Sequence, residues 1–527
     1  MNWEKFCFKL QDIAPGNNQS HIPNSNDEIL TNIRLEAKRN FTEYGIYPDS
    51  IHNQNGIWYF LIRDNERKSL VIHGKDNNFN DFEGEEMTVN GKPTKVCSLG
   101  NNNCDIIRHI FPFTNPSNHK GRNITIGLGD RLGVASAGHI RLVKDKPVFP
   151  VLAQQSIREL NLTGRTYRDV LSAASWDVFQ EGYTKGFGAD GDHLKTYDEV
   201  KMALDNGFTM ITLDCSEHIN NQVASYSSDE VKQKYSEIEL GERNRLESTY
   251  LNKSFKLNDV VAISFDQDSF RRIVLIYLKA IKYTLEIYNE VIKNCGRSID
   301  FEMSIDETLT PTTPESHYFV ASELIAGGVE ITSLAPRFCG EFQKGIDYRG
   351  YIKQFTEEFE LHVKIAQHFG YKVSVHSGSD KFSVFPIIGE KTGGKYHLKT
   401  AGTNWLEAVR VISAENPSLY RKIHKFALKH LNEAKKYYHI SADPSNIPDI
   451  DMLKDHELPS LFDQDDSRQV IHITYGLILQ AKDSEGKPLF KNDIYSTLFN
   501  YEEEYCKSLE KHIGKHLNLL GIRTDVL

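Results

Sequence analysis

The chain lacks several features that mark common classes of protein. No apolar run in the 527-residue sequence approaches the ~20 residues that a membrane-spanning helix needs. The N-terminus has no signal-peptide hydrophobic region. Cysteine is sparse, with seven scattered residues and no C-x-x-C pair, which is typical of a reduced cytoplasmic protein. The net charge is −10, which disfavours a polyanionic partner. We therefore expect a cytoplasmic protein with no nucleic acid and no membrane as partner.

Common nucleotide-binding and hydrolase motifs are also missing. The glycine-rich segment Gly127–Gly133 has the spacing G-x-G-x-x-x-G, which misses the dinucleotide fingerprint by one residue. The sequence contains no P-loop, no G-x-S-x-G elbow and no H-E-x-x-H helix. Asp130 and Arg131 within the glycine-rich segment remain candidates for binding a substrate.

A regular alternation of short apolar runs and amphipathic stretches begins near residue 121. Most gaps between the runs contain one helical pattern, and two of these helices stop at a glycine, Gly207 and Gly370. This rhythm predicts an α/β fold, a (β/α)8 TIM-type barrel over residues 121–415, with a doubly wound open sheet as the main rival. The eight expected strands are Ile124–Gly129, Val148–Ala153, Gly186–Asp190, Thr209–Asp214, Ser298–Ser304, Val329–Leu334, Tyr371–His376 and Tyr396–Ala401.

Other segments flank the expected barrel. Residues 1–120 hold short strand-like runs separated by asparagine-rich turns, which predicts a small N-terminal mixed α+β domain. Residues 217–262 are polar and interrupt the alternation, so we interpret them as an insertion that forms a lid, an oligomer contact or a surface elaboration. Residues 416–527 are helical and charged, which predicts a helical C-terminal extension.

The chemically informative side chains lie at the expected C-terminal ends of strands, where barrel enzymes keep their active sites. Asp192 and His193 follow the third strand, and His376 ends the seventh. Two imidazoles at one barrel mouth indicate a divalent metal, with Asp192 as a proton carrier. Glu302 lies on the polar face of the fifth strand. Its carboxylate needs a cation, either that metal or a lysine in a buried salt bridge.

Several side chains at the same end could bind an anionic substrate. Ser377 and Ser379 follow the seventh strand in a loop whose backbone N–H groups can gather an anion, and Lys381 adds positive charge. Arg337 follows the sixth strand and could clamp a carboxylate through two hydrogen bonds. Lys399 lies at the end of the eighth strand.

One segment of the C-terminal extension could also reach this end of the barrel. Residues 467–476 contain the pattern Ser-Arg-Gln-x-x-His, which places His472 near the segment's centre. We expect either that His472 enters the site or that the segment only packs on the barrel.

The Asp192–His193 pair, the strand over residues 208–214 and the loop over residues 375–379 resemble class II metal-dependent ketose aldolases. The resemblance implies that Asp192 transfers a proton and that His193 and His376 bind the metal. These aldolases carry a third metal histidine after the sixth strand, where this chain has none. Glu302 is therefore the expected third ligand, with Cys339 as a weaker candidate.

Longer motifs resemble the tagaturonate epimerase family over about residues 121–480. This resemblance implies epimerisation at C4 between D-tagaturonate and D-fructuronate, with a divalent metal such as zinc, manganese, nickel or iron. Tagatose and fructose are further expected substrates. The motifs that carry the resemblance are Gly127–Gly133, Gly186–Thr196, His376–Phe382 and His397–Asn404.

The two resemblances imply one mechanism, in which the C3–C4 bond is cleaved as in an aldolase and re-formed after the aldehyde rotates. Asp192 would move the proton, with Lys195 or His472 as a second acid–base group. The far carboxylate would be held by Ser377, Ser379, Lys381 and Arg337. An aldolase that releases its fragments, a non-catalytic sugar-acid binding protein and transient oxidation by bound NAD are the alternatives. A homo-oligomer is left open.

Overall fold

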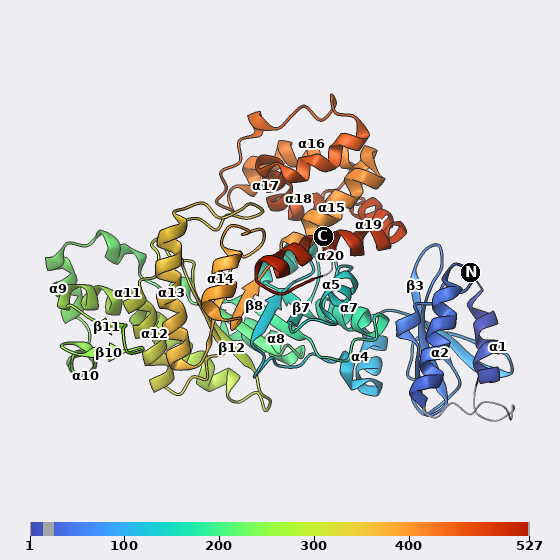
Figure 1. The fold of residues 1–527 in the computed structure, drawn as a ribbon, viewed down its shortest axis with the longest axis horizontal. Helices are drawn as coiled ribbons and strands as arrows, with labels where there is room; N and C mark the ends of the chain where they lie inside the picture. The colour runs from blue at the N-terminus through green and yellow to red at the C-terminus, as the bar shows by residue number, and fades with distance from the viewer. Residues whose placement is uncertain (1, 14–25, 525–527) are drawn as a thin grey trace.

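A closed barrel of eight parallel strands forms the centre of the computed structural model, which describes residues 2–13 and 26–524 (Figure 1). The pairing of β15 with β6 closes the cylinder, so the prediction of a barrel is confirmed and the rival open sheet is excluded. In chain order the strands are β6 (Ile124–Gly127), β7 (Phe149–Gln155), β8 (Gly188–Leu194), β9 (Met210–Asp214), β12 (Asp300–Ile305), β13 (Ser333–Pro336), β14 (Lys372–Val375) and β15 (Tyr396–Lys399).

Helices follow the strands and cover the outside of the barrel. Their ends carry ordinary helix signals: α8 begins at a capping box made by Thr196 and Glu199, and α13 ends at Gly370 in the left-handed conformation. The covering helices are α5 (Ser136–Val143), α7 (Tyr167–Gln180), α8 (Tyr197–Asp205), α11 (Gln267–Ile287), α12 (Pro314–Ala326), α13 (Ile352–Phe369), α14 (Phe385–Thr392) and α15 (Thr403–Glu415).

The strand β12 shows how the sequence pattern sets the two faces of the barrel wall. Phe301, Met303 and Ile305 are fully buried in the hydrophobic core. Because side chains alternate along a strand, Glu302 points to the opposite face, where it contacts side chains of β9, β13 and β15. The polar face therefore lines the inside of the barrel, as the sequence predicted.

The N-terminal part is an α+β unit beside the barrel, at the right of Figure 1. Its antiparallel sheet has the order β1-β2-β3-β5-β4. Two helices, α1 (Trp3–Ile13) and α2 (Asn26–Arg39), pack on one face, and α4 (Asn101–Ile110) connects the other face to α7. The strands are β1 (His52–Gln54), β2 (Ile57–Arg63), β3 (Lys68–His73), β4 (Gly84–Val89) and β5 (Lys92–Ser98).

The insertion after β9 packs on the side of the barrel, at the left of Figure 1. It contains α9 (Ser228–Ser236), α10 (Leu240–Tyr250) and the hairpin β10–β11 (Ser254–Lys256 and Ala262–Ser264). Its aromatic side chains lie against α11 and α12; the ring centroids of Tyr250 and Phe319 are 5.1 Å apart. No described residue of this insertion lines the two cavities at the barrel mouth, so its position favours a surface elaboration over a lid.

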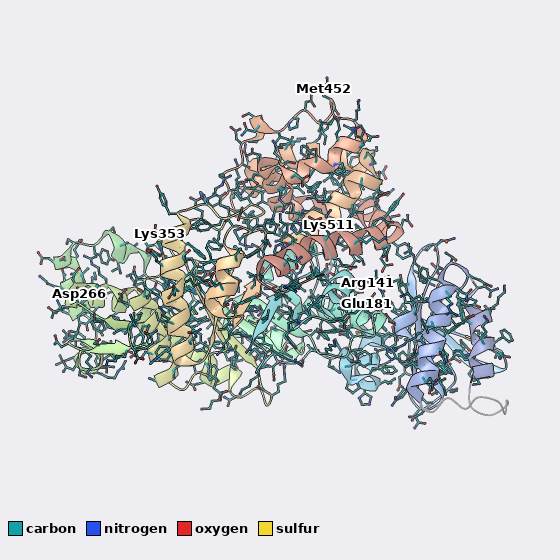
Figure 2. The ribbon with its side chains drawn as sticks, in the orientation of Figure 1. Arg141, Glu181, Asp266, Lys353, Met452 and Lys511 are labelled. Atoms are coloured by element: carbon teal, nitrogen blue, oxygen red, sulfur yellow. The ribbon has the colours of Figure 1, made fainter. Side chains whose placement is uncertain are left out.

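The C-terminal helices form a second hydrophobic core above the barrel. Arg141 on α5 joins them to the barrel, because it bridges Glu181 at 3.0 Å and Glu503 at 2.8 Å; Figure 2 shows Arg141 beside Glu181. Among the described helices none is long and apolar enough to span a bilayer. The C-terminal helices are α16 (Pro417–Ala434), α17 (Asp465–Ile473), α18 (Tyr475–Gln480), α19 (Lys491–Asn500) and α20 (Glu502–Leu519).

Candidate active site

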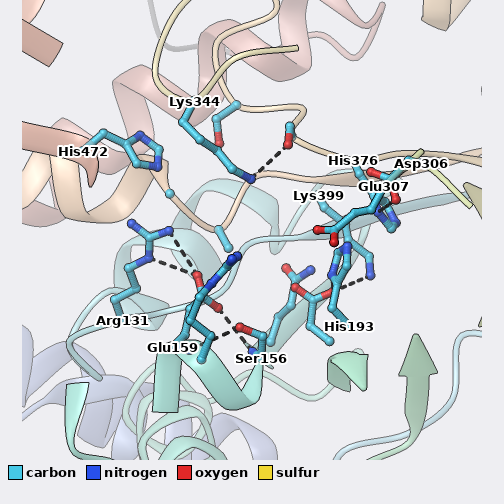
Figure 3. Close-up of a pocket in the computed structure, with 17 residues that line it drawn as sticks. Arg131, Ser156, Glu159, His193, Asp306, Glu307, Lys344, His376, Lys399 and His472 are labelled. Carbon is cyan, nitrogen blue, oxygen red and sulfur yellow. Dashed lines mark hydrogen bonds and ion pairs between the residues drawn. The ribbon is translucent and has the colours of Figure 1, made fainter. Parts of the chain in front are cut away.

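Two adjoining cavities open at the C-terminal ends of the barrel strands. The inner cavity, drawn in Figure 3, has a volume of about 90 Å³, and the outer one has about 360 Å³. Pockets for small molecules usually exceed the inner volume alone, so a six-carbon ligand needs part of both. The residues that line both cavities are Arg158, Asp306, Glu307, Lys344, His376 and Ser377.

The end of β8 brings Asp192 and His193 into the inner cavity. The strand runs past the expected end at Asp190, and its register with β9 shifts between Gly191 and Leu194. His193 has a φ of 54°, a left-handed conformation that costs a non-glycine residue free energy and is common at functional sites. Its Nδ1 lies 2.8 Å from Asp192 Oδ1, which leaves Nε2 for another partner.

Lys399 is the central cation beneath the cavity. Its Nζ lies 2.7 Å from Asp192 Oδ1, 3.0 Å from Asp190 Oδ2 and 3.0 Å from Glu302 Oε1. Burial alone would raise the pKa of Asp192, but Lys399 and His193 hold that pKa well below its usual value. Burial raises the pKa of Asp190 to about 6 despite the nearby Lys399. Asp192 therefore faces the cavity in its ionised form.

Glu302 orients His376. Its Oε1 lies 2.6 Å from His376 Nε2, and its other oxygen accepts a hydrogen bond from Ser333 Oγ at 2.5 Å. Glu302 is fully buried, and both of its oxygens have hydrogen-bond partners. The sequence left open whether Glu302 pairs with a metal or with a buried lysine, and Lys399 is that lysine.

Asp306, just beyond the end of β12, completes a group of possible metal ligands with His193 and His376. One ligand atom from each of the three residues lies within 4.8 Å of the others. His376 Nδ1 lies 3.2 Å from Asp306 Oδ1 and has no hydrogen-bond partner among the described residues. Glu302, expected as the third ligand, is not in this group, and Cys339 contacts Tyr348 instead.

A second group with metal-like spacing is formed by Asp380, His512 and His516, and most of its ligand atoms have protein partners. Arg468 on α17 lies 2.7 Å from Asp380 Oδ2, and His512 Nε2 lies 2.5 Å from Oδ1. His516 Nε2 accepts the backbone N–H of Asp380, while its Nδ1 donates to the carbonyl of His512. This group therefore fastens the loop after β14 to α17 and α20.

The opposite wall of the inner cavity is basic. Arg131 pairs with Glu159 at 3.1 Å, yet its Nη1 is buried without a hydrogen-bond partner among the described residues. Lys344 donates to Ser377 Oγ at 2.9 Å and has no carboxylate within salt-bridge distance in the described chain. Arg158 is exposed at the rim and lies over the ring of Tyr438.

Two neutral side chains also present unpaired buried atoms to the inner cavity. Both ring nitrogens of His472 and both amide atoms of Gln154 lack partners in the described structure. Trp405 Nε1 donates a hydrogen bond to the carbonyl of Ile471 at 2.8 Å. This contact fixes α17 in the position where His472, the residue after Ile471, reaches the cavity. Buried polar atoms are normally satisfied, so these atoms indicate a polar ligand.

The structure brings some of the predicted site residues together and places others elsewhere. Asp130 uses its carboxylate to accept backbone N–H groups of residues 132, 133 and 135. Lys381 is fully buried and donates to three backbone carbonyls, and Lys195 faces Asp214 and Glu217. Arg337 lines the outer cavity only. The predicted residues that line the inner cavity are Arg131, Asp192, His193, His376, Ser377, Ser379, Lys399 and His472.

Sequence reasoning missed Asp306, Gln154 and Lys344. The alternation of the sequence places Asp306 on the same polar face as Glu302 and Ser304, but it does not distinguish Asp306 from Glu302 as a metal ligand. Gln154 lies one residue beyond the expected end of the second strand. Lys344 lies in the long loop after β13, where no periodic pattern marks its side chain.

Comparison with known proteins identifies the family. The family model described as tagaturonate epimerase matches residues 47–520. A tagaturonate/fructuronate epimerase from Thermotoga maritima is 42% identical over 478 residues, which cover 90% of this chain and 97% of that protein. The glycerol-complexed crystal structure of the fructuronate-tagaturonate epimerase UxaE from Cohnella laeviribosi is 49% identical, with a TM-score of 0.89 over 94% of this chain and 100% of that one. The chain therefore belongs to the tagaturonate epimerase family.

Proposed function

We propose that the chain interconverts D-tagaturonate and D-fructuronate by inverting C4, with a divalent metal held at the barrel mouth. The single observation that carries the proposal is the convergence of His193, His376, Asp306 and the ionised Asp192 on one cavity, in a chain so similar to epimerases of these two sugar acids.

His193, His376 and Asp306 fit a metal because the hydrogen bonds of the two histidines leave one ring nitrogen of each free to bind it. His376 donates from Nε2 to Glu302 and His193 from Nδ1 to Asp192, the carboxylate–histidine arrangement that commonly orients metal ligands. With these tautomers, the lone pair of His376 Nδ1 faces the Asp306 carboxylate at 3.2 Å. Two acceptors at this distance need a proton or a metal cation between them, and a divalent metal would also engage His193.

The proposed reaction conserves every atom of the substrate. Asp192 takes the proton of the C4 hydroxyl; the C3–C4 bond breaks, its electrons pass into the C3–C2–oxygen system, and C4 becomes an aldehyde carbon. Rotation about the C4–C5 bond presents the other face of this aldehyde, the C3–C4 bond re-forms, and the proton returns to the C4 oxygen. A bound metal would stabilise the negative charge that develops on the C2 and C3 oxygens.

His472 is the second acid–base candidate that the structure favours over Lys195. Its imidazole lines the cavity and is 1% exposed, whereas Lys195 is held outside by Asp214. Burial, together with the charges of Arg131 and Lys344, holds the pKa of His472 well below its usual value. A neutral imidazole can donate one hydrogen bond and accept another.

The test is product chromatography after incubation of metal-loaded protein with D-tagaturonate. The wild-type protein should form D-fructuronate, and Asp192→Asn should retain its metal yet lose about 100-fold or more in turnover, since proton transfer contributes roughly that factor. Three-carbon products would instead identify an aldolase, and an unchanged substrate would indicate a sugar-acid binding protein. Near-normal turnover by Asp192→Asn would refute the assigned role.

A further inference from the structure

The inner cavity has walls of opposite charge. Asp192, Asp306 and Glu307 lie on one wall together with His193 and His376. Arg131 and Lys344 lie across the cavity from His193, as Figure 3 shows. An asymmetric ligand that carries a negative charge at one end therefore has one favoured orientation.

Lys344 is the cation inside this cavity that has no carboxylate partner among the described residues; Arg158 has none either, but it is exposed to water at the rim. Lys399 has three carboxylates and Arg131 has Glu159. Lys344 is half-buried, and its Nζ contacts only the neutral hydroxyl of Ser377 within the described chain. A charge removed from water normally acquires a partner of opposite sign, so a ligand is the natural source of that partner.

Arg131 provides a second donor at the same wall. Its guanidinium is 4% exposed and is fixed by Glu159 and by the ring of Tyr475, whose centroid lies 4.0 Å away. The remaining Nη1 is buried and unpaired. Arg131, Lys344 and His472 all line the inner cavity, so the three groups surround one space.

We propose that Lys344 and Arg131 bind the substrate carboxylate and thereby select a uronate over the corresponding neutral ketose. This assignment rests on the proposed function, because it puts the ketone end at the acidic wall and the carboxylate at the basic wall. It also replaces the expected anchor Lys381, whose ammonium group is occupied by backbone carbonyls.

The arrangement has a consequence for the proposed cleavage. When the C3–C4 bond breaks, the carboxylate remains on the aldehyde fragment, which holds C4, C5 and C6. A carboxylate bound to Lys344 and Arg131 keeps this fragment in the cavity while C4 rotates. Retention of the fragment is what separates an epimerase from an aldolase that releases its products.

Calorimetric titration of D-fructuronate and D-fructose into wild-type protein and Lys344→Met tests the assignment. Loss of a charged hydrogen bond should weaken fructuronate binding by about 10- to 100-fold, whereas fructose binding should stay within twofold of wild type. Lys353→Met is the matched control, since Lys353 lies on α13 (Figure 2) and its side chain is 90% exposed. Lys344→Gln repeats the measurement with a polar side chain if the methionine variant does not fold.

Each outcome decides between the alternatives. Equal weakening of both ligands, no weakening of either, or no binding of fructuronate to the wild-type protein would overturn the assignment. If the binding results agree with it but no epimer forms from fructuronate, the proposed function fails while the carboxylate site stands.

Discussion

Lys399 Nζ lies 2.7 Å from Asp192 Oδ1 and connects the last barrel strand to the third across the barrel interior. The same ammonium group also pairs with Asp190 and Glu302. Lys399 is therefore the shared cation of three buried carboxylates, and it helps to hold the proposed proton carrier in its ionised form.

Replacement of Lys399 by methionine should damage both stability and activity. The variant would leave three buried carboxylates without their cation, and breaking a buried ion pair costs about 3–5 kcal/mol. We expect a clearly lower thermal midpoint and loss of epimerisation, measured by calorimetry and product chromatography. Lys353→Met, on the exposed face of α13, should change neither; an unaltered midpoint for Lys399→Met would contradict the role given to this lysine.

Gly402 controls the position of His472. A Cβ atom at residue 402 would lie 2.5 Å from His472 Nε2, so Gly402→Ala must displace the imidazole from the cavity. We expect kcat to fall about 10-fold or more, as small misplacements of reacting groups commonly cost, with little change in thermal midpoint. Gly100→Ala is the control, because its Cβ would meet only Ser98 Oγ at 3.5 Å. Full activity in Gly402→Ala would argue against a role for His472.

His139 on α5 should make the protein less stable in mild acid. It is 1% exposed, both of its ring nitrogens lack partners in the described structure, and burial lowers its pKa from 6.5 to about 3. Between these pH values the unfolded chain binds a proton that the folded chain does not, so stability falls as pH decreases from 6.5. At pH 5 this site costs about 2 kcal/mol relative to neutral pH.

His139→Leu should remove that part of the pH dependence. The difference in unfolding free energy between pH 7.5 and pH 5 should shrink by about 2 kcal/mol, as measured by denaturant titration at the two pH values. His109→Leu is the control, because His109 is exposed on the surface of α4. The same pH dependence in His139→Leu and wild type would show that His139 does not contribute.

Loss of the carboxylate anchor should uncouple cleavage from recombination. In Lys344→Met the aldehyde fragment is held by fewer contacts, so some of it should escape before C3–C4 re-forms. Dihydroxyacetone, the other fragment, should then appear as a minor product of D-tagaturonate and be detected by a coupled dehydrogenase assay. Complete absence of this product, together with slower epimerisation, would contradict retention of the fragment by Lys344.

The barrel could be predicted from the sequence because it depends on local pattern. Alternating side chains on β12 put Glu302 on the inner face whatever its neighbours are, and His376 follows an apolar strand directly. The sequence also pointed to Asp192, His193 and Lys399, which the structure brings to one mouth.

The specific partners of each side chain could not be predicted. Asp130 satisfies backbone groups of its own loop, and Lys381 is fixed by carbonyls, two of them more than 30 residues away. Glu302 and Asp306 share one strand face, but only tertiary packing puts Lys399 beside the first and His193 near the second. Residue type and spacing do not encode which oxygen remains free for a ligand.

Metal content and epimerisation measured together test the central claim most directly. The wild-type protein should retain about one divalent ion per chain after dialysis and convert D-tagaturonate to D-fructuronate. Asp306→Ala should lose both the ion and the activity, while Asp205→Ala, at an exposed carboxylate that pairs with Lys201 on the surface of α8, should keep both. Full metal content and normal turnover in Asp306→Ala would contradict the metal site described by His193, Asp306 and His376.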